Sequence, residues 1–368
     1  MACEACSLFT GRTLAKGFLK SSIEITFSNP KPYKDNLKPN PMTLKKIQLT
    51  IFLLALVAGR AGTQTYAEKL GYPAGAKVAI LHVDDAGMSY DSNEGAIRAL
   101  EDGVANSVSV MMTCPWTPGF VHFLQSKPQT DAGLHLTLTA EWKDYRWGPL
   151  TGTSSPNLLD QEGCLWHSVE ELVKHANAED VSREFESQLQ RARKMGFEPT
   201  HFDTHMGSAF GSPAFLERYL QFGIRHRIPV MFPGGHNTLI NQQLKGMGMP
   251  AEQARTIGQQ LWDAGLPVLD DLHNFSYGWQ YPENHAMSDE ELQREHARKY
   301  MESFEQLQPG VTMVIMHCSA TTEVFPHISD SGPLRRADML AMLSSELKQY
   351  LSEKGIILTT WRELMQRR

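Results

Sequence analysis

From Lys77 onward the chain alternates between short β-branched runs and longer amphipathic stretches. The short runs have the length and composition of buried strands, and the longer stretches have helical periodicity. Strands that alternate with helices favour an α/β fold with a parallel sheet, here a TIM-like (β/α) barrel, with an open doubly wound sheet as the alternative. The eight predicted strands are 77–85, 107–112, 132–139, 200–205, 228–232, 266–271, 311–317 and 355–361, and the clearest predicted helices are 168–195, 213–225, 288–307 and 333–354.

The net charge argues against nucleic acids and anionic membranes as partners. The 368 residues carry a formal net charge of −6, and 21% of them are charged, so the chain has no basic excess that would bind nucleic acid or an anionic membrane surface. We therefore expect a small-molecule or polymer ligand. The sequence carries no signal for a particular oligomeric state.

The amino-terminal part contains the pattern of a secretory signal peptide. The stretch "MTLKKIQLTIFLLALVAGRAG" begins at Met42 with two lysines, continues through an apolar run from Ile47 to Gly59, and ends in small residues. The apolar run is too short for a comfortable membrane span. We expect an exported protein, periplasmic or extracellular, with no membrane attachment once residues 42–61 are cleaved. Residues 1–41 would then be a mis-assigned leader, 62–76 a linker and 77–368 a single barrel domain.

The cysteines predict no disulfide framework. Cys3 and Cys6 fall in the expected leader, which leaves Cys114, Cys164 and Cys318, an odd number without a CxxC pair. One disulfide bond between two of these three cysteines remains possible in an oxidising compartment.

Polar side chains gather where the predicted strands end. In α/β folds, catalytic groups collect at this edge, where the strands end and the following loops begin. A barrel core alone would not need this distribution. The residues are Asp84 and Asp85 on the first strand, His135 on the third, Asp203 and His205 on the fourth, Asp270 and Asp271 on the sixth, and His317 on the seventh.

The segment "HFDTH" places His201, Asp203 and His205 on one face if it is a strand. Four residues of strand span roughly 13 Å, whereas bonds from a metal to nitrogen are about 2 Å. The two histidines therefore cannot both bind one ion unless the strand breaks. We expect one of them to be a ligand, with the other ligands coming from other strands.

The natural further donors are Asp84 or Asp85 together with His135. An Asp/His/His set with open positions activates water and polarises a carbonyl oxygen. Of two adjacent carboxylates, one can hold the metal while the other takes a proton from the attacking water. His317 could then protonate a leaving group. We expect one divalent metal ion, for which this set suits zinc while magnesium also remains allowed.

Four ordered blocks carry a family resemblance. They are "HVDDAGMSYDSNEGAIRALEDGVANSVSVMM", "GLHLTLT", "PTHFDTH" and "IMHCSA", and they run from about residue 78 toward the carboxy terminus. The chain resembles the YdjC-like carbohydrate deacetylases, relatives of chitooligosaccharide deacetylase and, more distantly, of NodB-type polysaccharide deacetylases.

The resemblance implies a fold, a reaction and a role for five residues. The fold would be a somewhat irregular barrel of seven or eight strands. The reaction would be hydrolysis of an N-acetyl group from an amino sugar or oligosaccharide. Asp85, His135 and His205 would bind the metal, Asp84 would be the base and His317 the acid.

The chain departs from the family pattern near the expected pocket. Ala86 stands where the family has an aromatic residue, and Met206 and Gly207 replace residues of a histidine-rich run. An insertion at 141–168 carries three of the seven tryptophans. These changes leave the expected ligands in place but alter the surroundings of the substrate.

Aromatic residues of this insertion are candidates to stack on a sugar. The alternative is a loop that only covers the barrel end. Asp203 is expected to orient a neighbouring group rather than act as base. Asp270, Asp271 and His273 could contact substrate or bond a loop, and Arg335 and Arg336 could form a solvated helix face. The expected substrate contacts are Trp142, Tyr145, Arg146, Trp147, Asp203, Thr321 and Phe325, with Trp279 and Tyr281 opposite.

Two other functional classes remain open from the sequence. A different metallohydrolase, such as a phosphoesterase or an amidohydrolase, could use the same ligands on another bond. A non-catalytic glycan-binding protein could keep the barrel and the aromatic loop, but it would not need the four residues Asp84, His135, His205 and His317 together. Export argues against a phosphorylated cytoplasmic sugar as substrate.

Overall fold

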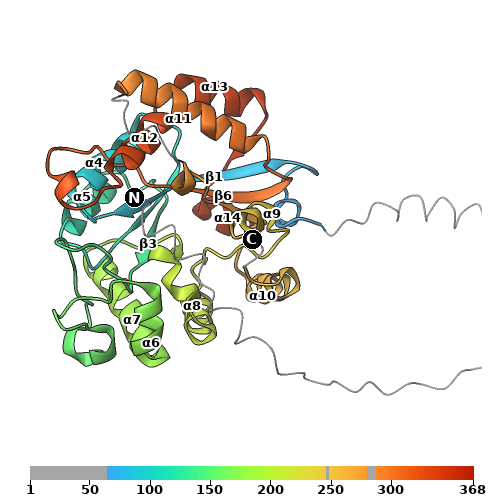
Figure 1. Ribbon diagram of the computed structural model, residues 1–368. Coiled ribbons are helices and arrows are strands. Elements are labelled where there is room, and N and C mark those ends of the chain that lie inside the picture. The colour runs from blue at the N-terminus through green and yellow to red at the C-terminus, as the bar shows by residue number, and fades with distance from the viewer. Residues whose placement is uncertain (1–63, 246–247, 280–286) are drawn as a thin grey trace, which may run out of the picture. The chain divides into compact units, whose positions relative to one another are not determined.

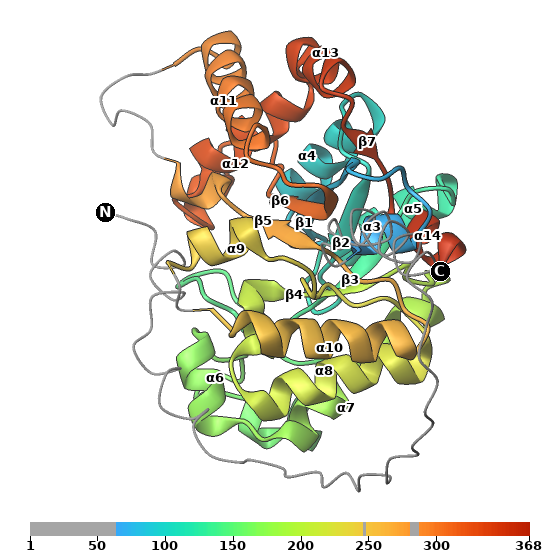
Figure 2. The same ribbon diagram turned by 90° about the vertical axis from the view of Figure 1, so that its right-hand side faces the viewer.

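The computed structural model describes residues 64–245, 248–279 and 287–368 (Figure 1). The expected leader and signal peptide, as well as Tyr281, lie outside these residues. In the described part a parallel sheet lies between two groups of helices, with α6, α7 and α8 on one side and α11, α12 and α13 on the other (Figures 1 and 2). The α/β class predicted from the sequence is therefore confirmed.

The sheet has the order β4-β3-β2-β1-β6-β5, and β7 pairs with the first residues of β1. All these pairings are parallel. The register places His135 beside Asp203, so polar residues of neighbouring strands meet at the carboxyl end of the sheet. The strands are β1 (Lys77–Ala86), β2 (Ser107–Val110), β3 (Ala132–Leu136), β4 (Phe202–Thr204), β5 (Asp271–His273), β6 (Gly310–Met316) and β7 (Ile357–Leu358).

The predicted strand 228–232 is reduced to a single bridge between Val230 and Phe202. Pro229 lies within this run and Pro233 directly follows it, and because proline has no N–H to donate, the ladder cannot continue through them. The predicted strand 266–271 contributes a bridge at Leu269, and the named strand β5 begins only at Asp271. The described strands therefore form a parallel half-barrel rather than the eight regular strands expected.

Two predicted helices are each divided by a capping residue. The stretch 168–195 splits before Asn177, whose side chain accepts from the N–H of Asp180 and starts a new helix. Ser344 divides 333–354 in the same way. The helices are α3 (Tyr66–Lys69), α4 (Tyr90–Glu101), α5 (Thr117–Ser126), α6 (Val169–His175), α7 (Ala178–Lys194), α8 (Pro213–His226), α9 (Thr238–Gln243), α10 (Ala251–Asp263), α11 (Asp289–Phe304), α12 (Gly332–Met342), α13 (Ser345–Glu353) and α14 (Trp361–Arg367).

Asp270 fastens the segment that precedes β1 to the sheet. Its carboxylate accepts from the backbone N–H groups of Tyr66 at 2.8 Å, Ala67 at 3.0 Å and Val311 at 2.9 Å. The segment expected as a linker thus includes the short helix α3, with Tyr66 and Ala67 buried. Gly310 lies beside this carboxylate with φ +136°, where an added Cβ would meet the Asp270 side chain at 2.5 Å.

Asp271 fastens a second segment. It accepts from the backbone N–H groups of Leu239 at 2.8 Å and Ile240 at 3.3 Å, at the start of α9. Both carboxylates of the predicted acidic cluster therefore bond backbone, which is the second of the two roles expected for them. No helix among the described residues has both the length and the apolar character needed to cross a membrane.

Candidate metal centre and active site

The end of β1 carries a bulge that changes where Asp84 and Asp85 point. The register with β2 shifts between Val83 and Ala86, and Asp85 has a left-handed backbone with φ 67°. In a regular strand the two side chains would point to opposite faces. Here both carboxylates approach the Nε2 of His135, from Asp85 Oδ1 at 3.3 Å and from Asp84 Oδ2 at 3.9 Å.

His205 leaves the sheet at the end of β4. The strand stops at Thr204, and the two residues after His205 have left-handed backbones, with φ 53° at Met206 and 63° at Gly207. This break separates His205 from His201 and turns its ring toward His135. The Nδ1 of His205 lies 3.4 Å from His135 Nε2 and 3.3 Å from Asp85 Oδ1.

Asp85 Oδ1, His135 Nε2 and His205 Nδ1 fit the donor set of a small divalent metal. All three residues are buried, and Asp85 Oδ1 has no partner with hydrogen-bond geometry among the described residues. Bonds of 2.0–2.1 Å in a tetrahedron give distances of about 3.3–3.4 Å between donor atoms. The three distances of 3.3, 3.3 and 3.4 Å match this spacing.

The outer nitrogens of the two histidines contact carboxylates. His135 Nδ1 lies 2.8 Å from Asp203 Oδ1, and His205 Nε2 lies 2.9 Å from Glu141 Oε2. Such carboxylate partners fix the tautomer and the orientation of metal-binding histidines. Asp203 therefore orients His135, the first of the two roles expected for it. It is buried beneath the site, so the substrate contact also expected of it is wrong. Glu141, the first residue of the insertion, was not predicted as part of the site.

The acidic surroundings also shift the pKa values of these groups. Burial alone would lower the pKa of His205, but Glu141 and Asp85 raise it to about 9. Burial would raise the pKa of Asp203, but His135 and His82 hold it well below its usual value. Carboxylates that attract a proton to these rings equally favour a divalent cation.

Arg335 holds the second oxygen of Asp85. Its Nη1 donates to Asp85 Oδ2 at 2.6 Å, and the guanidinium is buried. Burial would raise the pKa of Asp85, but Arg335 keeps it well below its usual value, so the carboxylate stays ionised with Oδ1 directed at the histidines. The solvated helix face expected here is therefore wrong for Arg335, whereas its neighbour Arg336 pairs with Asp289 at the surface.

Asp84 and His317 lie on the other side of the donor set. His317 Nε2 is 3.7 Å from Asp84 Oδ2 and contacts the hydroxyl of Tyr277. The backbone N–H of His317 donates to Asp338 Oδ2 at 2.9 Å, which anchors the end of β6. Burial lowers the pKa of the His317 ring to about 4. Asp84 and His317 thus occupy the places that a base and an acid would need.

Comparison with known proteins places the chain in a family. The family model described as YdjC-like protein matches residues 78–353, which include every residue of the donor set. The chain belongs to the YdjC-like family. The resemblance inferred from the four sequence blocks is thereby confirmed.

Several relatives of this YdjC-like chain align over most of their length. A carbohydrate deacetylase of Thermus thermophilus is 31% identical over 295 residues, which are 80% of this chain and 96% of the relative. A carbohydrate deacetylase of Brevibacillus brevis is 25% identical and covers 77% of this chain and 98% of itself. The crystal structure of an Enterococcus faecalis protein, provisionally named for cellobiose-phosphate cleavage, has a TM-score of 0.61 at 21% identity and covers 78% and 99% of the two chains. This structure supports the fold.

Part of the aromatic loop of this YdjC-like chain packs against the donor set. Trp147 is buried, donates from Nε1 to the carbonyl of Thr139 at 2.9 Å, and meets the His205 ring at a centroid distance of 6.1 Å. Trp142 packs on Trp147 and lies 5.7 Å from the Arg335 guanidinium. Trp142 is half-buried and therefore keeps surface that a substrate could contact.

Two other residues of the loop are engaged in holding it. The Arg146 guanidinium bonds Asp160, Glu162 and two backbone carbonyls, while the Tyr145 hydroxyl donates to the carbonyl of Met88. Both side chains therefore fasten the loop, and their positions give no support for the expected sugar contact.

The two predicted contacts after β6 lie elsewhere. Phe325 is fully buried in the hydrophobic core, so no substrate reaches it. Thr321 has a left-handed backbone with φ 48°, and its hydroxyl accepts from Arg336 at 3.3 Å. The expected substrate contact is thus wrong for Phe325. For Thr321 it stays a prediction that this position does not support. The prediction failed for Phe325 because an apolar side chain in a loop can also bury its surface in the core.

His201 belongs to a buried layer beneath the site. Its ring stacks on Trp361 at 5.3 Å, and Gly133 on β3 makes room for it, since an added Cβ would meet the ring at 2.5 Å. Within the part of the chain that the structure describes, its Nε2 has no hydrogen-bond partner. Burial and the neighbouring His82 lower the pKa of His201 to about 4, so the ring is neutral at pH 7. His201 is therefore a packing residue, as expected.

We expect His201 to make the protein lose stability in mild acid. Its pKa is about 4 when folded and about 6.5 when unfolded, so the unfolded chain binds an extra proton between these values. The free energy of unfolding should fall by up to about 3 kcal/mol as the pH drops from 6.5 to 4. Urea unfolding at pH 7 and pH 4.5 should show a weaker pH dependence for His201→Gln than for the wild type. An equal pH dependence would contradict this assignment, and His226→Gln, at a half-buried position near the end of α8, is the control.

Proposed function

We propose that this protein is a metal-dependent carbohydrate deacetylase, which removes the N-acetyl group from an amino sugar or glycan. The observation that carries the proposal is the convergence of Asp85 Oδ1, His135 Nε2 and His205 Nδ1 at 3.3–3.4 Å beside Asp84 and His317. The names of its YdjC-like relatives, two of them the carbohydrate deacetylases described above, support the same reaction.

The chain's own residues account for binding and proton transfer in this reaction. When bound at the donor set, a divalent ion would polarise the amide carbonyl and lower the pKa of a water at an open position. Asp84 takes the proton from the attacking water at Oδ2, the oxygen that faces the site. The His317 ring is neutral at pH 7, so it first receives this proton from Asp84 Oδ2, 3.7 Å away, and then passes it from Nε2 to the departing amine. Arg335 keeps Asp85 ionised, and Trp147 shields one side of His205 from water.

The same distances support zinc as the bound metal. A tetrahedral arrangement with bonds of 2.0–2.1 Å suits zinc, whereas an octahedron of that size would bring neighbouring donors to about 2.9 Å. The observed 3.3–3.4 Å separations support zinc over magnesium.

The substrate is proposed to be an N-acetylated sugar or oligosaccharide met outside the cytoplasm. The signal-peptide pattern at 42–61 supports export, and native protein recovered from the periplasm or the medium would begin near Gly62. The half-exposed Trp142 supports contact with a sugar ring, because aromatic faces stack on sugars with little loss of entropy.

The test combines metal content with product release. Protein beginning near Gly62 should bind one divalent metal per chain and release acetate from at least one member of a panel of N-acetylated sugars and chitooligosaccharides. Treatment with a chelator should stop acetate release, and added zinc should restore it. Bound metal with no acetate from the panel, but with turnover of a phosphate ester or another amide, would contradict deacetylation. Sugar binding without any turnover of metal-loaded protein would indicate a binding protein.

A further inference from the structure

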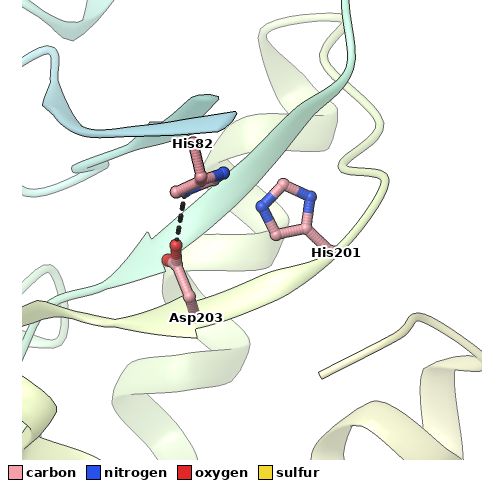
Figure 3. Close-up of side chains that lie close together, drawn as sticks. All are labelled: His82, His201 and Asp203. Carbon is pink, nitrogen blue, oxygen red and sulfur yellow. Dashed lines mark ion pairs between the residues drawn. The ribbon is translucent and has the colours of Figure 1, made fainter. Parts of the chain in front are cut away.

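His82 lies at the centre of a buried polar cluster below the donor set (Figure 3). It is two residues before Asp84 on β1 and is fully buried. Its Nε2 lies 2.8 Å from Asp203 Oδ2 and 3.1 Å from Asp84 Oδ1. His82 therefore contacts both the proposed base and the carboxylate that orients His135.

The hydrogen bonds around Nδ1 fix a proton on that nitrogen. Nδ1 of His82 lies 2.9 Å from the hydroxyl oxygen of Ser107, and this hydroxyl donates its single proton to Asp131 Oδ2 at 2.7 Å. Asp131 also accepts from the backbone N–H groups of Trp361 and Arg362, so it acts as an ionised acceptor. The Ser107 oxygen can then only accept from His82, and Nδ1 must carry a hydrogen.

The donors and acceptors around Nε2 likewise require a proton on that nitrogen. Nε2 lies 3.1 Å from the hydroxyl oxygen of Ser109, which donates its single proton to Asp84 Oδ1 at 3.4 Å and can therefore only accept from His82. Nε2 also faces the carboxylate oxygens of Asp203 and Asp84, which can only accept when ionised. A bare nitrogen lone pair facing two buried carboxylates would be strongly unfavourable. Both ring nitrogens of His82 are therefore donors, and the ring is a buried cation. The electrostatic balance agrees, because burial would lower the pKa of His82 but Asp203 and Asp84 raise it to about 9.

This protonation argues against a second metal at the cluster in Figure 3. His82, His201 and Asp203 are close enough together to hold an ion. A histidine that binds a metal must direct a lone pair at it, and both nitrogens of His82 are committed as donors. The cluster is therefore held by ion pairs of His82 with Asp203 and Asp84, and His82 acts on the site through these two carboxylates.

The contacts of Asp84 show what His82 does for the site. Oδ1 of Asp84 is held by His82 at 3.1 Å and by the hydroxyl of Ser109 at 3.4 Å. Oδ2 is left facing the site, 3.9 Å from His135 Nε2 and 3.7 Å from His317 Nε2. One carboxylate oxygen is thus tethered, and the other is free to receive a proton.

We propose that His82 is a positioning residue for deacetylation, whose protonated ring is fixed through Nδ1 by Ser107 and through Nε2 holds Asp84 with Oδ2 toward the substrate and Asp203 against His135. This proposal rests on the proposed function for its kinetic consequence, but the doubly protonated ring does not depend on it. His82 touches neither the metal donors nor the reacting atoms.

The first arm of the test is spectroscopic. Metal-loaded protein labelled with ¹⁵N-histidine is studied by NMR at pH 8, and the His82 signals are assigned by their loss in His82→Gln. An ordinary histidine has a pKa of about 6.5 and is neutral at this pH, whereas His82 should retain hydrogens on both ring nitrogens. A ring nitrogen without a hydrogen would overturn the proposal. This arm needs no substrate, so it remains decisive if no sugar is deacetylated.

The second arm compares two histidines of the same buried layer. His82→Gln should lower kcat by about 10–100-fold with KM within about twofold and with stoichiometric metal, as is usual when a residue that orients catalytic groups is changed. His201→Gln is the matched control, because the His201 ring lies 5.0 Å from His82 and is equally buried. It should keep kcat within about threefold. Unchanged kcat in folded His82→Gln, or equal losses in both variants, would overturn the proposal. His82→Asn provides a smaller substitution if the glutamine variant fails to fold.

Discussion

Replacing His205 with alanine is expected to remove both the bound metal and the deacetylase activity. His205 Nδ1 is one of three donor atoms that lie 3.3–3.4 Å apart. The remaining pair, Asp85 and His135, would leave too few ligands for a stable site, since metal sites in hydrolases normally use three protein ligands. The loss of activity should exceed about a hundredfold, beyond what is typical of residues that only orient a ligand.

The measurement is metal content by elemental analysis together with acetate release. His226→Ala is a suitable control, because His226 pairs with Glu186 at the end of α8, outside the donor set. This control should keep stoichiometric metal and normal turnover. Stoichiometric metal and full activity in His205→Ala would refute the assignment of the donor set.

The second large effect is expected for Asp84→Asn. The amide has nearly the shape of the carboxylate but cannot take a proton from water, so kcat should fall by about 10²–10⁴-fold. Metal content should stay stoichiometric, because the donor atoms come from Asp85, His135 and His205. KM should change little, since the lost interaction belongs to the transition state.

Steady-state kinetics on the metal-loaded variant would check this prediction. Asp102→Asn makes the same chemical change at an exposed position after α4 and should leave kcat unaltered. A kcat within about threefold of the wild type in Asp84→Asn would mean that another group acts as the base. Loss of metal in this variant would instead make Asp84 a ligand.

Some features of the site were visible in the sequence because they depend on local order. Alternating strands and helices placed Asp85, His135 and His205 at the carboxyl edge of one parallel sheet, and the structure brings them together there. The role of Asp203 beside a histidine could be predicted, and the position of His82 two residues before Asp84 was a signal that went unused. On a strand, residues two apart share a face.

Other features depend on contacts between distant segments. Arg335 reaches Asp85 across 250 residues of sequence, and nothing in its own helix predicts that its guanidinium is buried. Glu141 meets His205 because the insertion folds back over the end of the sheet. The same folding engages Arg146 in holding the loop, which a list of polar residues in an aromatic stretch could not indicate.

The sequence alone determined the α/β class, the edge of the sheet that carries the chemistry and the family blocks. These follow from hydrophobic periodicity and strand direction, which act over a few neighbouring residues. Only the tertiary structure decided that a bulge turns Asp84 and Asp85 to one side, that the chain breaks after His205, and that prolines interrupt the strand expected at 228–232. Backbone conformations of this kind persist because surrounding packing and hydrogen bonds hold them, and those partners come from every part of the chain.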